Sequence, residues 1–178
     1  MIRDIENKLI YHGSYTEVRI PDLKKCADGK DFGVGFYTTT DKSQAIRFSR
    51  RVARIHGQPY GILNIYQLSN LNGLKVCEFD TTDEQWLHCV VGFRSRARRA
   101  LAEPYSQFDV LIGKIADDDT SRVINAYIAG AYGAVGSPQA VQTAISNLIP
   151  EALKNQITFR SADSLARITF KRSERIRL

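Results

Sequence analysis

The chain has 178 residues, of which 43% are hydrophobic and 25% are charged. These values are ordinary for a globular protein and exclude the disordered and collagen-like classes, and the length predicts a single domain over residues 1–178. The formal net charge is +6, which indicates either an attraction for phosphate polyanions or a solvated surface that keeps the protein soluble.

Two clusters hold much of the basic excess. Residues 94–99 contain four arginines, and residues 160–178 contain six basic residues against two acidic ones. No apolar run approaches the roughly 20 residues that span a bilayer, the N-terminus has no signal-peptide core, and the three cysteines form no CxxC pair. We therefore expect a cytoplasmic protein with no membrane contact.

The first third of the chain predicts two short strands and one helix. An apolar segment over residues 8–11 ends at a His-Gly turn and predicts a strand. A glycine-containing loop follows over residues 21–35. Residues 36–39 are β-prone, and Asp41 predicts the N-cap of a helix over residues 42–56.

Two further strands and a helix are expected next. A β-rich run covers residues 62–68, and a strand is predicted at 76–79. Thr82 or Asp83 is expected to cap the helix that follows. On that helix we interpret Trp86 as a core residue and Arg94 as a surface residue.

The remaining elements predict the fold class. Residues 108–115 are almost wholly apolar, which predicts a buried central strand. The other expectations are helices over residues 120–131, from Pro138 to before Pro150 and over 161–168, a strand over 156–159, and a basic tail. Because strands and helices alternate irregularly, we predict an α+β fold rather than a parallel doubly wound sheet.

Common nucleotide and hydrolase motifs are missing from the sequence. No GxGxxG opens a helix, and neither GxxxxGK[ST] nor GxSxG occurs. The three histidines lack the spacing of metal ligands, so no metal site is predicted.

Three separated segments stand out instead. They read YHGS (residues 11–14), DFGVGFYTT (residues 31–39) and NQITF (residues 155–159). Taken singly, each has an ordinary structural explanation, such as glycines at positive φ or a core tyrosine. Their order and spacing together favour a functional interpretation.

In this order, the segments resemble the ADP-ribosyltransferase superfamily, in its diphtheria toxin and poly(ADP-ribose) polymerase branch. YHGS is similar to the HG[ST] motif of the first strand, GVGFY to the GxGxY segment, and NQITF to the third strand, which usually reads NEYxVY. The chain looks most like a group of small bacterial toxin-like domains with DFGxGFYTT and NQIxF segments. The resemblance implies a split mixed or antiparallel sheet with flanking helices.

The resemblance also implies that NAD⁺ is the substrate and assigns three residue roles. Breaking the nicotinamide–ribose bond develops positive charge on the ribose, as in glycoside hydrolysis. His12 is expected to bond a ribose hydroxyl, the Gly13 backbone to bond the carboxamide, and the Tyr37 ring to stack on the nicotinamide. With Gln156, His12 and Tyr37 form the expected catalytic set.

Other residues complete the expected NAD-binding site. A second carboxamide contact is assigned to Ser43 or Gln44, because the register of the helix start is ambiguous. Phe48 is either a second wall of the ring site or a core residue. The expected NAD-binding residues are His12, Gly13, Ser14, Gly35, Tyr37, Ser43, Gln44 and Phe48.

The third motif departs from the family pattern, because Gln156 stands where that pattern has glutamate. A glutamate accepts a charge-assisted hydrogen bond, which is roughly twice as strong as a neutral one, whereas Gln156 supplies neither charge nor a general base. Asp109 or Asp117 is a candidate auxiliary acid. Alternatively, the acidic run at residues 117–119 is a solvated loop that caps the next helix.

We therefore expect a bacterial mono-ADP-ribosyltransferase that modifies a nucleic acid or a protein. The resemblance implies a toxin-like effector of a toxin–antitoxin or phage-defence system, and an acidic antitoxin is a second candidate partner for the basic surface. Two alternatives stay open. One is an NAD glycohydrolase that depletes NAD⁺, and the other is a module that binds NAD⁺ without catalysis.

Overall fold

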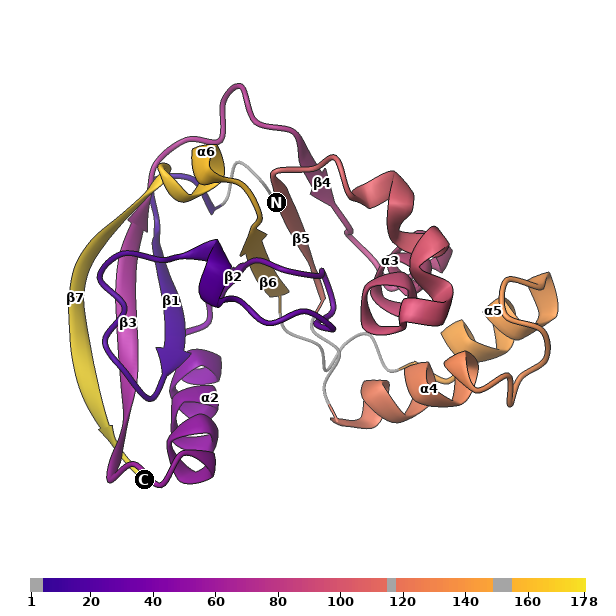
Figure 1. The fold of residues 1–178 in the computed structure, drawn as a ribbon, viewed down its shortest axis with the longest axis horizontal. Helices are drawn as coiled ribbons and strands as arrows, with labels where there is room; N and C mark the ends of the chain where they lie inside the picture. Colours follow the sequence, from indigo (N-terminus) through magenta and orange to yellow (C-terminus); the bar gives the residue numbers. More distant parts are fainter. Residues whose placement is uncertain (1–4, 115–117, 149–154) are drawn as a thin grey trace.

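The computed structural model describes residues 5–114, 118–148 and 155–178 (Figure 1). Its strands form two sheets. The first is antiparallel, in the order β1-β3-β7, and the second is mixed, in the order β2-β6-β5-β4, with β4 and β5 parallel. The strands are β1 (Leu9–Ser14), β2 (Phe36–Thr38), β3 (Tyr60–Leu68), β4 (Val76–Glu78), β5 (Val110–Lys114), β6 (Asn155–Phe159) and β7 (Ile168–Arg177). The predicted α+β class with mixed and antiparallel sheets is confirmed.

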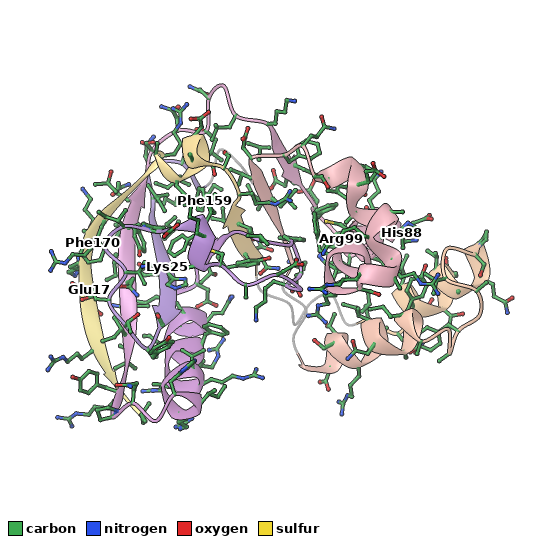
Figure 2. The ribbon with its side chains drawn as sticks, viewed as in Figure 1. Glu17, Lys25, His88, Arg99, Phe159 and Phe170 are labelled. Carbon is green, nitrogen blue, oxygen red and sulfur yellow. The ribbon has the colours of Figure 1, made fainter. Side chains whose placement is uncertain are left out.

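The two sheets share one hydrophobic core and meet at one point. Buried side chains of both sheets pack together, among them Ile10, Tyr66, Ile112 and Phe159, the last labelled in Figure 2. At the meeting point, Tyr11 at β1 and Thr39 beyond the end of β2 exchange two backbone hydrogen bonds, of 2.8 and 3.0 Å. We call this junction of β1 and β2 the seam.

Helix α2 (Lys42–Ile55) covers β1 and β3 at short range. It begins where predicted, with the Asp41 carboxylate accepting a hydrogen bond from the backbone N–H of Gln44. Its inward side carries small residues, and a Cβ added to Gly13 of β1 would lie 2.2 Å from the carbonyl oxygen of Ala45. The glycine of the YHGS segment is therefore required by the packing of α2 on the sheet.

Helices α3 (Glu84–Arg94), α4 (Asp118–Ile128) and α5 (Pro138–Ser146) gather on the side of the second sheet that faces away from the first sheet (Figure 1). Trp86 of α3 is fully buried, as predicted, and its indole N–H donates to the carbonyl of Lys114 at 3.1 Å. Short helices also precede β2 and β7. The further helices are η1 (Leu23–Lys25), η2 (Arg96–Tyr105) and α6 (Ala162–Leu165). No helix within the described ranges is long and apolar enough to cross a bilayer.

The basic segment after residue 168, for which the sequence predicted no helix or strand, forms β7. This strand pairs with β3 along its whole length and buries Ile168, while Phe170 and Ile176 are partly buried. Its charged side chains lie at the edge of the first sheet, where charge is typical because it discourages pairing with other chains.

Candidate functional site

The three motif segments lie on adjacent strands at the seam (Figure 1). YHGS forms β1, which is bridged to the end of β2, and Tyr37 of β2 pairs with Thr158 of β6. Residues that are more than 100 positions apart in the sequence are thereby brought side by side. This arrangement places His12, Tyr37 and Gln156 on three neighbouring strands.

The imidazole of His12 is fixed by a backbone contact. Its Nδ1 lies 2.7 Å from the carbonyl oxygen of Tyr37. Because a carbonyl only accepts, Nδ1 must carry the hydrogen, which leaves Nε2 as an acceptor. Burial lowers the pKa of His12 below its ordinary value, against the opposing effect of the bond to Tyr37. His12 is therefore a neutral acceptor at pH 7.

Tyr37 uses its hydroxyl to hold the preceding loop. The hydroxyl donates to the carbonyl of Gly33 at 2.7 Å and accepts from the backbone N–H of Phe32 at 3.0 Å. Burial raises the pKa of Tyr37 well above its ordinary range. The hydroxyl is consequently unsuited to acid–base chemistry, and the ring is the part of Tyr37 that remains for recognition.

The second glycine motif is also explained by backbone geometry. Gly33 has a φ of +72°, which favours glycine. A Cβ on Gly35 would lie 2.5 Å from Cγ2 of Thr158 and 2.9 Å from the carbonyl oxygen of Phe159. Gly35 therefore permits the close approach of the chain entering β2 to β6.

The residues assigned to the helix start and to the end of β1 have different environments. Gln44 reaches the seam, where its side-chain oxygen accepts from the hydroxyl of Thr39 at 3.2 Å. Ser43 is exposed, and the hydroxyl of Ser14 accepts from the backbone of Thr16. Phe48 is 50% exposed, so the core role considered for it is wrong, and a role as a ring wall stays a prediction.

Gln156 contacts a carboxylate that the sequence did not single out. Its amide Nε2 donates to Oδ2 of Asp31 at 3.3 Å, and the two residues are 5% and 8% exposed. The other carboxylate oxygen of Asp31, Oδ1, lies 2.7 Å from Nε and 2.6 Å from Nη2 of Arg94. We call this buried set of Asp31, Arg94 and Gln156 the polar triad.

The interpretation of Arg94 as a surface residue is wrong. Its side chain is 19% exposed, and besides Asp31 it donates to the hydroxyl of Ser121 of α4 at 3.2 Å. Arg94 thus ties α3 and α4 to the loop that precedes β2. The signal that could have found the pair was a charged residue at the head of the otherwise apolar DFGVGFY segment.

The candidate auxiliary acids lie elsewhere or outside the described residues. Oδ2 of Asp109 accepts from the backbone N–H of Lys75 at 2.9 Å, and hydrogen bonds with Ser161 and with the Lys75 backbone lower its pKa. Gln156 pairs with Gly113, at the opposite end of β5 from Asp109. Asp117 lies outside the described residues. The described carboxylate beside Gln156 is that of Asp31.

The donor set fits hydroxyl and amide groups better than a metal. Within the ranges that the structure describes, no group of three or more His, Cys, Asp or Glu side chains lies close enough to hold an ion. Among the described residues of the site, the His12 imidazole and the Gln156 amide are neutral, and the buried carboxylate of Asp31 is paired with Arg94.

Comparison with known proteins places the chain in a family. A family model described as "Protein of unknown function (DUF3990)" matches residues 9–170, so the chain belongs to the DUF3990 family. The match spans all three motif segments and the polar triad. No curated protein and no solved structure matches the chain.

Proposed function

We propose that the protein is a mono-ADP-ribosyltransferase that uses NAD⁺. The observation that carries the proposal is the meeting of His12, Tyr37 and Gln156 on three adjacent strands, with the His12 ring bonded to the Tyr37 backbone. The resemblance described above assigns these residue types, in this order, to NAD⁺ cleavage. The shared placement supports reading them as one site.

The chemistry needs orientation and charge stabilisation more than acid catalysis. The C1′–N bond of the nicotinamide ribose breaks, and its electron pair leaves with neutral nicotinamide. The positive charge on the ribose is then quenched when a nucleophile of the acceptor bonds to C1′ and loses its proton. In this scheme Nε2 of His12 accepts from a ribose hydroxyl, and the Tyr37 ring packs on the nicotinamide.

We propose a nucleic acid as the acceptor, because the basic charge is concentrated on α2, which begins beside the site, and on β7, at the edge of the first sheet. Helix α2 has five basic and no acidic residues, and β7 has four basic residues against Glu174 alone. The positive charge of these two elements together is larger than the net charge of the whole chain, +6. The remaining residues therefore carry a slightly negative net charge. Figure 2 shows side chains with nitrogen tips projecting outward from α2. Such a concentration attracts phosphates.

The resemblance further suggests a setting, which we propose as a toxin-like effector of a toxin–antitoxin or phage-defence system. An acidic antitoxin would compete with nucleic acid for the basic side of α2. Induced expression should then arrest bacterial growth, and the His12→Ala variant should not. Equal growth with both proteins, at equal expression, would argue against a toxic role.

One experiment tests the enzymatic proposal. The protein is incubated with NAD⁺ labelled in the adenylate part and with a bacterial lysate, and free nicotinamide and label in the RNA, DNA and protein fractions are measured. We expect nicotinamide release with label in a nucleic acid fraction. Label in protein alone would contradict the proposed acceptor. Free ADP-ribose without any labelled macromolecule would indicate a glycohydrolase, and no release above a blank would leave a non-catalytic module.

A further inference from the structure

The polar triad contains a carboxylate whose two oxygens have separate partners. Oδ1 of Asp31 receives both Nε and Nη2 of Arg94, and Oδ2 receives the amide of Gln156. The three residues come from the loop before β2, from α3 and from β6. The triad therefore joins the second motif to the third, 125 residues further along the chain.

The contact fixes the orientation of the Gln156 amide. A carboxylate only accepts hydrogen bonds, so the end of the amide that faces Oδ2 must be the nitrogen. The carbonyl oxygen Oε1 is then directed away from Asp31. A side-chain amide on an exposed strand would rotate between both orientations, whereas Gln156 is held in one by a buried charge.

We propose that Asp31 is a positioning residue that acts through Gln156, holding its carbonyl oxygen toward the ribose of NAD⁺. This inference rests on the proposed function. It also gives a physical reason for glutamine at position 156. A glutamate there would place a second carboxylate beside Oδ2 of Asp31, and two carboxylates at such a distance cannot both be ionised without a large penalty. In this site the carboxylate is therefore supplied by Asp31 of the loop before β2, and the amide by Gln156 of β6.

The proposal predicts that the two groups can be exchanged. In Asp31→Asn the remaining oxygen should stay with Arg94, so that an NH2 group faces Gln156 in place of the acceptor that orients its amide. Gln156→Glu creates the repulsion between two carboxylates. The double variant, Asp31→Asn with Gln156→Glu, again has one amide facing one carboxylate, with the two groups exchanged between positions 31 and 156. It also keeps a single negative charge beside Arg94. Asp28→Asn is the matched control, because Asp28 lies in the same loop and pairs with Arg99 at 3.0 Å in an exposed position.

The test measures kcat and KM for NAD⁺ by nicotinamide release in all five proteins. We expect each single variant at the triad to lower kcat roughly 10-fold to 100-fold, the range seen for partners that orient a contacting group, with little change in KM. The double variant should recover at least tenfold over Gln156→Glu, and Asp28→Asn should match the wild type. A double variant no more active than Gln156→Glu, or wild-type rates for Asp31→Asn, would overturn the proposal.

Unfolding temperatures of the same proteins separate this inference from the proposed function. If the wild type releases no nicotinamide, the proposed function fails and the positioning role fails with it, but the coupling of the two side chains is still measured. If the two side chains are coupled, the double variant should have a higher unfolding temperature than Gln156→Glu. If the changes in unfolding temperature of the two single variants simply add in the double variant, the contact itself is contradicted. An active wild type with an unrescued double variant would remove the inference alone. If Gln156→Glu does not fold, a folded double variant supports the coupling and an unfolded one contradicts it.

Discussion

Helices α2 and α3 are held against the rest of the molecule in opposite ways. Helix α2 contacts β1 and β3 through small residues, Ala45, Ser49 and Ala53, and its outer side is charged. Helix α3 packs against η2, α4 and α5, and most of its residues are buried, with Trp86 the largest. The difference teaches that one helix is built to expose a surface near the site and the other to support it from within.

The largest effect is expected when the central side chain of α3 is truncated. Trp86→Ala should lower the free energy of unfolding by about 3–5 kcal/mol, because it leaves a cavity and removes the indole hydrogen bond to the carbonyl of Lys114. Phe48→Ala on α2 is the matched variant, and it should change stability by about 0.5 kcal/mol or less, since Phe48 is half exposed. Urea unfolding measures both, and equal losses would remove the contrast between the two helices.

The next effect concerns activity at the seam. His12→Ala should reduce nicotinamide release by about 10²-fold or more, the order of losing one preorganised contact. Circular dichroism and the unfolding temperature would establish that the variant is folded. A folded variant with the wild-type rate would show that His12 only joins β1 to the Tyr37 backbone.

A smaller effect tests the close packing of α2. Gly13→Ala should cost about 1–3 kcal/mol, as for overpacked cores, because the new Cβ meets the backbone oxygen of Ala45. Adding Ala45→Gly should give no rescue, since the clash is with the backbone and not with the Ala45 side chain. Thermal unfolding of both proteins measures this, and recovery in the double variant would contradict the stated geometry.

The burial of His12 predicts a dependence of stability on pH. Its pKa is lowered in the folded protein, so the unfolded chain takes up the proton first as the pH falls through about 6.5. Stability should then decline between pH 7 and 5.5 by up to about 1.4 kcal/mol per pH unit. The decline should be weaker in His12→Asn. Unfolding by urea at each pH measures the slope, and parallel slopes for the two proteins would contradict the prediction.

The smallest effect sharpens the contrast between the outer sides of the helices. Replacing Arg47 and Arg51 together with alanine should reduce the slope of log Kd against log salt by about 1.4 for a fluorescent single-stranded RNA. The control replaces Arg96 and Arg98 of η2, the helix that carries Arg99, which lies near α3 and away from α2 in Figure 2. Equal losses of slope would show that phosphate binding is not concentrated at α2.

The sequence predicted local features of the fold well. Asp41 caps α2 as predicted, and Asp83, one of two residues predicted to cap α3, does so. These predictions succeed because a helix cap depends only on backbone groups nearby in the sequence. The strand β7 was missed, since its charged residues hide the pairing with β3. Edge strands tolerate such residues, so their periodicity is weak.

The polar triad was missed for a different reason. Asp31 and Arg94 are 63 residues apart, and Gln156 lies still further along the chain. The charged residue at the head of the apolar DFGVGFY segment signals that Asp31 needs a partner, but nothing local to it identifies Arg94 or Gln156, which become its neighbours only when α3 packs against the loop before β2. Asp109 was considered instead, as a carboxylate that could supply the charge that Gln156 lacks. It lies just before β5, and the strand register places Gln156 against Gly113, at the other end of that strand.

The strand order also determines when the site comes into being during synthesis. Strand β2, made early, has β6 as its partner, so Gln156 must leave the ribosome before His12 and Tyr37 acquire their third neighbour. Chains released or cut before that point lack β6 and β7, and pairing between such distant strands is slow to form. A nascent chain would therefore stay without a complete site until β6, which ends at Phe159, had been made.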